Sequence, residues 1–170
     1  MIRVKASLTA LALTVASGTA ALVFAAPAQA ATCYWYSGQS GTSSNCDNKD
    51  PDVLGSTCGS DARTVASVVL KRSYDGAATG PTVDLRYSNN CRTVWARIRG
   101  AWGVDYDQVG CTVTIHRNSD GQELYKSPSF GSTNATVWTN VLYDAGVTSY
   151  AKGHCDTGPG YSYDGRTINW

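Results

Sequence analysis

Apolar and polar residues alternate in several short segments of this chain. Val83 and Leu85 alternate with polar neighbours in 82–87, and Val113 and Ile115 do so in 111–117. Because successive side chains of a strand point to opposite faces, this pattern predicts half-buried strands. The segment 63–70 is apolar and β-branched and predicts a buried strand, although its length also suits two helical turns. Further strands are expected at 93–99, 122–126, 135–143 and 147–151.

Turn-forming residues separate these segments. The Asp-Gly pair in 118–121 is typical of a β-hairpin. The segments 47–59 and 154–166 are rich in Gly, Asp or Pro, and we expect loops there. Many short strands with turns between them predict an all-β fold, a single small antiparallel β-sandwich or barrel.

The alternation is clearest in 93–99. Its apolar residues Val94, Ala96 and Ile98 suit a core. The remaining side chains, together with one from the preceding strand, are expected to share the outer face: Arg86, Thr93, Trp95, Arg97 and Arg99. This row is either an ordinary polar face, in which arginine stems shield the tryptophan, or a partner-binding patch of Arg86, Trp95, Arg97 and Arg99.

The first thirty residues have a basic start, an apolar stretch and the motif Ala28-Gln29-Ala30. These features are typical of a cleaved signal peptide, so we expect a secreted, extracellular protein. About 140 residues would remain, which is enough for one domain. Without Arg3 and Lys5 the formal net charge falls from +1 to about −1, which favours neither nucleic acid nor an anionic membrane as a partner.

Residues 31–45 are predicted to form a flexible N-terminal extension before a domain at 46–170. Tyr34, Trp35 and Tyr36 are prone to form a strand, and the Ser/Gly-rich stretch after them is typical of a linker. Because side chains alternate, Trp35 must point away from the two tyrosines. Either this aromatic tip folds back onto the domain, or all three residues bind a partner.

All six cysteines follow the expected cleavage point, and an even number in an exported chain predicts three disulfides. Six cysteines allow 15 pairings, among which the sequence does not choose. Our working hypothesis pairs Cys33 with Cys46, Cys58 with Cys91, and Cys111 with Cys155. A zinc site is disfavoured because the chain contains no C-x-x-C motif.

The sequence contains no nucleophile elbow, zincin motif or phosphate-binding glycine loop. We interpret His116 as a surface residue of a strand and His154 as a loop residue, and we expect no enzymatic activity. No catalytic residue, cofactor or metal ligand is therefore assigned. The acidic segments 47–52 and 105–107 could hold calcium, but Asx turns also explain both, and we favour the turns.

Three blocks of this sequence resemble the YjfA-like family of small exported bacterial domains. They are the segment 46–51, then Cys58 with 61–65, and then 85–88 with 91–97. The segment 137–144 also fits, so that the resemblance covers roughly 46–144. Cys33, Cys111 and Cys155 lie outside the family pattern.

Secreted actinobacterial members of that family resemble the small adaptor of umbrella toxin particles. The resemblance implies a non-enzymatic adaptor that joins a lectin-bearing, trypsin-like subunit to a large toxin polypeptide. It also implies that the N-terminal extension inserts into the cleft of the lectin-bearing subunit. The alternatives are a carbohydrate- or cell-wall-binding module, whose exposed Trp and Tyr would stack on sugars, and a hydrolase or enzyme inhibitor.

Overall fold

The computed structural model describes residues 33–36, 43–54, 56–105, 109–158 and 160–170. The expected signal peptide, 1–30, lies outside the described residues. In chain order the described elements are α1 (Ser56–Ser60), β1 (Arg63–Arg72), β2 (Ala78–Ser88), β3 (Thr93–Ala101), β4 (Cys111–Arg117), β5 (Glu123–Lys126), β6 (Ala135–Trp138), β7 (Leu142–Tyr143), β8 (Ser149–Asp156) and β9 (Ser162–Arg166).

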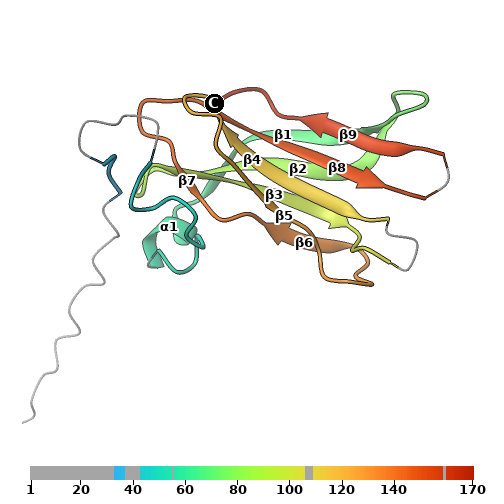
Figure 1. Ribbon diagram of the computed structural model, residues 1–170, viewed down its shortest axis with the longest axis horizontal. Coiled ribbons are helices and arrows are strands. Elements are labelled where there is room, and N and C mark those ends of the chain that lie inside the picture. The colour runs from blue at the N-terminus through green and yellow to red at the C-terminus, as the bar shows by residue number, and fades with distance from the viewer. Residues whose placement is uncertain (1–32, 37–42, 55, 106–108, 159) are drawn as a thin grey trace, which may run out of the picture.

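The strands form one antiparallel sheet in the order β5-β4-β8-β9-β1-β2-β3-β6, with β7 beside β3. The junction between β9 and β1 is short, because only Lys71 with Asp164 and Arg72 with Tyr163 are paired there. The sheet folds over at this junction into two facing layers, a nearly closed antiparallel sandwich or barrel (Figure 1). The predicted all-β fold is confirmed.

Side chains that point inward from both layers fill the main core. The alternation in 82–87, 93–99 and 111–117 correctly predicts the apolar residues that point into the main core. The fully buried residues of these three strands include Val83, Leu85, Val94, Ala96, Ile98, Val113 and Ile115. Burial of such apolar side chains is the main favourable term in the stability of a domain of this size.

The prediction of a buried strand at 63–70 is half correct. The segment is a strand, β1, but Leu70 is its one fully buried side chain, and Val69 is 39% exposed. Among the described residues, β9 pairs with β1 only at Lys71 and Arg72. β1 also belongs to an antiparallel sheet that packs one face on the core, so it does not need the two-sided burial that its composition suggested.

The prediction of a loop at 154–166 is wrong. β8 continues to Asp156 and β9 occupies Ser162–Arg166, with Gly153 opposite Gly165 in the ladder. Glycine and aspartate have low strand propensity, but here small residues are needed because the layers approach closely. A Cβ atom added to Gly153 would lie 2.5 Å from Cγ2 of Val83.

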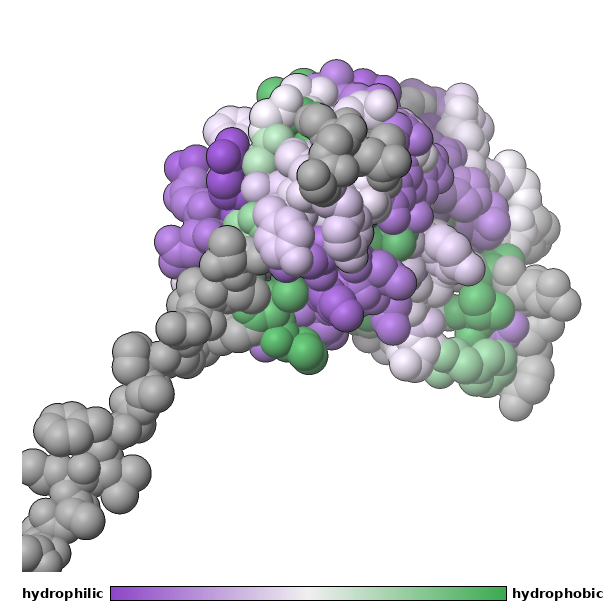
Figure 2. All heavy atoms as spheres, turned by 60° about the vertical axis from the view of Figure 1, so that its left-hand side comes forward, coloured by the Kyte–Doolittle hydropathy of each residue, from purple (hydrophilic) through white to green (hydrophobic). Residues whose placement is uncertain are grey.

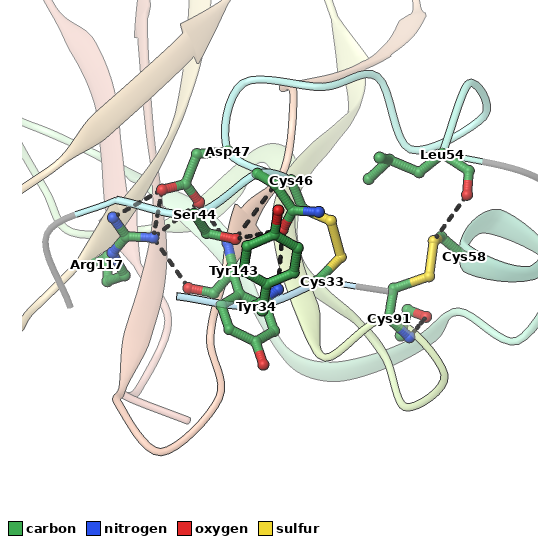
Figure 3. Close-up of a disulfide and its surroundings, with 12 residues drawn as sticks. Cys33, Tyr34, Ser44, Cys46, Asp47, Leu54, Cys58, Cys91, Arg117 and Tyr143 are labelled. Atoms are coloured by element: carbon green, nitrogen blue, oxygen red, sulfur yellow. Dashed lines mark hydrogen bonds and ion pairs between the residues drawn. A yellow bond between two sulfur atoms is a disulfide. The ribbon is translucent and has the colours of Figure 1, made fainter. Parts of the chain in front are cut away.

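A second, smaller core lies on the outer face of β3 and corrects the prediction for Trp95. Trp95 is on that face, as its alternation requires, but it is only 4% exposed. It packs with Leu54, Val141 and three cysteines, Cys46, Cys58 and Cys91. The segment before β1, which includes α1, covers this face, and the Cys58–Cys91 disulfide holds it there (Figure 3). Trp95 is therefore not an exposed contact residue.

The three disulfides are those of the working hypothesis: Cys33–Cys46, Cys58–Cys91 and Cys111–Cys155. Cys111 and Cys155 are directly opposite each other in the β4–β8 ladder. Three disulfides indicate an oxidising, extracellular environment. Within the described ranges, no helix has both the length and the apolar character needed to span a membrane.

Candidate interaction site

The N-terminal extension is a loop closed by a disulfide. Cys33 and Cys46 join its two ends, and Trp35 and Ser44 form an antiparallel bridge. The backbone N–H of Tyr34 donates to Oδ1 of Asn45 at 2.9 Å. Figure 3 shows this disulfide beside Tyr34 and Ser44. Because both ends are covalently joined, this segment, which we call the aromatic loop (33–46), cannot act as a free tail.

Trp35 fastens the aromatic loop to the domain. Its ring lies 4.8 Å from that of Tyr143, and its Nε1–H donates to the carbonyl oxygen of Ala145 at 3.1 Å. The guanidinium of Arg117 lies 4.8 Å from the centre of the same ring, within range of a cation–π interaction. The sequence left open whether the tip folds back onto the domain or binds a partner, and Trp35 folds back onto the domain. Tyr34 and Tyr36 point away and remain 53% and 47% exposed.

A fully buried arginine supports the place where Trp35 docks. Arg117 donates hydrogen bonds to both carboxylate oxygens of Asp47 and to the carbonyl oxygen of Tyr143 (Figure 3). It also donates a hydrogen bond to Asp120. Burial lowers the pKa of Arg117, but the hydrogen bonds and charges of Asp120 and Asp47 outweigh it, so the pKa is raised. The cation is thus permanent, and the network gives the loop a fixed base. Sequence reasoning missed it, since Arg117 and Asp47 lie 70 residues apart.

Two carboxylates of the acidic segment 47–52, which was considered as a calcium site, accept hydrogen bonds from protein groups. The Asp47 carboxylate binds Arg117 and accepts the backbone N–H of Tyr143 at 2.7 Å. The Asp50 carboxylate accepts the N–H of Asp52, which is an Asx turn. Across the part of the chain that the structure describes, no group of three or more His, Cys, Asp or Glu residues could hold a metal ion. The second acidic segment, 105–107, lies largely outside the described residues.

The predicted arginine row exists on the outer face of β2 and β3, but it surrounds a carboxylate. Arg86 is paired with Trp95, and Asp84 with Arg97, in the β2–β3 ladder. Asp84 is 1% exposed and accepts hydrogen bonds from Arg97, Arg99 and the Ser67 hydroxyl at 2.7, 2.8 and 2.6 Å. Burial acts to raise the pKa of Asp84, but these three donors outweigh it and lower the pKa. Asp84 stands two residues before Arg86, so alternation could have placed it on this face.

Trp138 extends the arginine row and was not singled out from the sequence. It is paired with Arg97 in the β3–β6 ladder and is 39% exposed. Trp138, and not Trp95, is therefore the partly exposed tryptophan beside the arginine row. The segment 135–143 did predict a strand, and alternation with Val137 would have placed Trp138 on the outer face.

The two histidines lie on strands and have acidic partners. His116 is stacked on Tyr150 and lies 2.9 Å from Glu123. His154 lies on β8, which corrects its assignment to a loop, and its Nδ1 and Nε2 atoms lie 2.6 Å from Asp164 and 3.2 Å from Asp156. The hydrogen bond to Asp164 raises the pKa of His154. The Ser162 hydroxyl donates to Asp164 and not to His154, so this group lacks the serine–histidine contact of a hydrolase triad.

The end of the molecule that carries the extension presents a mostly hydrophilic surface. Figure 2 shows that this face is largely purple and white, with green confined to small, separate areas. Large contiguous apolar patches are typical of obligate interfaces. On this face, binding would instead depend on single aromatic and charged side chains.

Most of the chain matches the profile of a known protein family. A family profile described as "Protein of unknown function (DUF2690)" matches residues 44–152. The match includes Arg86, Arg97 and Trp138 but begins after the exposed tyrosines of the aromatic loop. No curated protein and no solved structure matches the chain. The profile covers well over half of the sequence, and the chain therefore belongs to the DUF2690 family.

Proposed function

We propose that this protein is a secreted, non-enzymatic adaptor in an extracellular antibacterial toxin complex of the umbrella type. It would link a lectin-bearing, trypsin-like subunit to a large toxin polypeptide. The resemblance of 46–144 to such adaptors suggests these partners. The three disulfides are compatible with an extracellular site of action.

The observation that carries the proposal is the exposed tyrosine pair of the aromatic loop. The rings of Tyr34 and Tyr36 lie 6.3 Å apart, while Trp35 between them anchors the loop from the other side. A loop held in place by a disulfide and a half-buried anchor, Trp35, loses little conformational entropy when it binds. Tyrosine is also among the residues that contribute most to protein interfaces.

The geometry of this pair favours a protein partner over a carbohydrate. The planes of the two rings are inclined by 85°, so the rings meet edge to face. Two such rings do not form the flat platform on which a sugar ring stacks. They do form a ridge that could enter a cleft in a partner.

Substitution of both tyrosines tests the adaptor function. Tyr34→Ala with Tyr36→Ala should reduce capture of the lectin-bearing subunit by tagged protein from culture supernatant by about tenfold or more. The domain should remain folded, because both side chains are largely exposed. Substitution is preferable to deletion of 32–45, which would leave Cys46 without its disulfide partner.

The matched control replaces two other exposed tyrosines, Tyr74 and Tyr125, which are 63% and 76% exposed. Tyr74→Ala with Tyr125→Ala should leave capture unchanged. Equal capture by the wild type and the Tyr34/Tyr36 variant, with both proteins folded by circular dichroism, would refute the role of the loop.

A further inference from the structure

The outer face of β2, β3 and β6 carries more positive than negative charge. Three arginines, Arg86, Arg97 and Arg99, share this face with one buried carboxylate, Asp84. The Asp84 carboxylate accepts hydrogen bonds from Nε and Nη2 of Arg97 and also from Nε and Nη2 of Arg99. No described residue accepts a hydrogen bond from Nη1 of Arg97. One carboxylate therefore serves two arginines, and donors remain free.

Arg86 forms no salt bridge or hydrogen bond with an acidic residue among the described residues. Its Nη1 donates to the hydroxyl of Thr64 and its Nη2 to the carbonyl oxygen of Ala62, both at 2.8 Å, and both acceptors are neutral. Burial lowers the pKa of Arg86, the positive charge of Arg97 lowers it further, and the negative charge of Asp84 offsets these effects only in part. The fold thus holds two neighbouring cations in a position where an added anion would be favourable.

These cations open into a crevice between the sheet and the segment that covers Trp95. The crevice has a volume of about 190 Å³, and its walls include Pro51, Asp52, Arg86, Arg97 and Trp138. Trp138 also lines a neighbouring hollow of about 230 Å³, so its half-exposed ring stands between two depressions. We call the first of these the arginine crevice.

We propose that the arginine crevice receives the carboxylate of an Asp or Glu side chain presented by a protein partner. The proposal rests on the adaptor function and assigns a second contact surface, separate from the aromatic loop. The carboxylate would accept hydrogen bonds from Nη1 of Arg97 and from Nε of Arg86, while the backbone of the acidic segment would lie against Trp138.

The charge of the crevice fits a single carboxylate. The charged residues of its wall are Arg86, Arg97 and Asp52, and the adjoining Arg99 and Asp84 form an ion pair, so the three positive and two negative charges leave an excess of one. A monoanion neutralises this excess, whereas a phosphate dianion would exceed it. Aromatic and arginine side chains around a small pocket are the usual composition of a dominant contact in a protein interface.

A titration with short peptides tests the crevice without any natural partner. The peptide Ac-Gly-Glu-Gly-NH2 should cause saturable shifts of the Arg97 Nε–H and Trp138 indole N–H signals in nitrogen-15 NMR spectra. The matched peptide with Gln in place of Glu should cause none. Equal shifts from both peptides, or none from either, would refute the proposal. Tighter binding of glucuronate than of the Glu peptide would overturn it in favour of acidic sugars.

Variants then test the crevice in the complex. Trp138→Ala and Arg97→Lys should each reduce capture of one partner, the one not bound by the aromatic loop, by about tenfold. Trp170→Ala is the matched control, because Trp170 is 42% exposed and Trp138 39%. Arg97→Lys retains the positive charge beside Asp84 but does not reproduce the two guanidinium donors, so circular dichroism of this variant must show a folded domain before loss of capture is assigned to the crevice.

The outcomes separate this proposal from the adaptor function. If the wild type captures no partner, the adaptor function fails, and the peptide titration still decides whether the crevice binds a carboxylate. If the Tyr34/Tyr36 variant loses its partner while the Trp138 and Arg97 variants retain both, the adaptor function stands and the crevice proposal is wrong.

Discussion

Asp144 shows how far a single residue of this protein departs from its usual chemistry. Its side chain is 6% exposed and accepts one hydrogen bond from the Ser149 hydroxyl at 2.7 Å. Burial raises the pKa of Asp144 to about 7, although Ser149 and the positive charges of Arg117 and Arg92 act against the increase. The folded protein therefore retains a proton that the unfolded chain releases near pH 4.

The variant Asp144→Asn should remove part of the pH dependence of stability. In the wild type, the unfolded chain binds fewer protons than the folded protein between the two pKa values, so stability is lost as the pH rises from about 4 to about 7. The amide does not titrate, and the variant should gain roughly 4 kcal/mol relative to the wild type across this interval.

Urea denaturation of both proteins at about pH 4, 6 and 8 measures this effect. Comparing the difference between the two proteins cancels the contribution of other groups, such as His154. A difference that is the same at every pH would show that Asp144 ionises normally in the folded state.

At the scale of the element, periodicity and packing give different information. The apolar residues of β2, β3 and β4 point inward as their alternation predicts, because the period of a strand is local. The sequence did not predict β9, because Gly165 and Asp164 are poor strand formers. The close approach of the two layers nevertheless favours small residues there. The hydrogen bonds of the ladder and the contact across the layers outweigh local propensity.

Gly153 offers a direct test of this close approach. Gly153→Ala should lower the free energy of unfolding by about 1–3 kcal/mol, since the added Cβ would lie 2.5 Å from Val83. Gly165→Ala should lower the free energy of unfolding by less, because its added Cβ would lie 3.1 Å from Cδ2 of Leu70. Thermal unfolding of the two variants shows which of them is less stable. A Gly153 variant as stable as the wild type would mean that the layers are able to separate there.

At the scale of the whole molecule, a covering segment decides which face is exposed. The described residues of this segment, 46–54 and 56–60, cross the outer face of β3, and their contacts with Trp95 and Val141 form the second core. The Cys58–Cys91 disulfide connects this segment to the β2–β3 turn. The arginine crevice exists only because this segment forms one of its walls.

Removal of this disulfide should uncover Trp95. Cys58→Ala with Cys91→Ala should cost about 2–4 kcal/mol of stability, and backbone hydrogen exchange around Trp95 should accelerate. Cys111→Ala with Cys155→Ala is the control, because that disulfide joins β4 to β8 in the other layer and should leave exchange at Trp95 unchanged. Unchanged exchange in the first variant would show that packing alone retains the cover.

Much of the fold was predictable, and less of the candidate site was. Most strand positions, the opposite directions of Trp35 and its two neighbouring tyrosines, and the arginines on one face follow from alternation along single strands. The roles of Trp95 and Trp138 did not follow, because both depend on which distant segment lies over the sheet. The ion pairs of Asp84 and Arg117 also depend on contacts between separate elements.

The sequence by itself determined the all-β class, the inward residues of the main core and the disulfide content, because strand periodicity and cysteine number are local or compositional properties. Only the tertiary structure decided which outward residues remain accessible. It buried Trp95 under the segment 46–60, docked Trp35 on Arg117, and left Tyr34, Tyr36 and Trp138 exposed. Exposure depends on contacts between residues far apart in the chain, and the period of one strand contains no information about them.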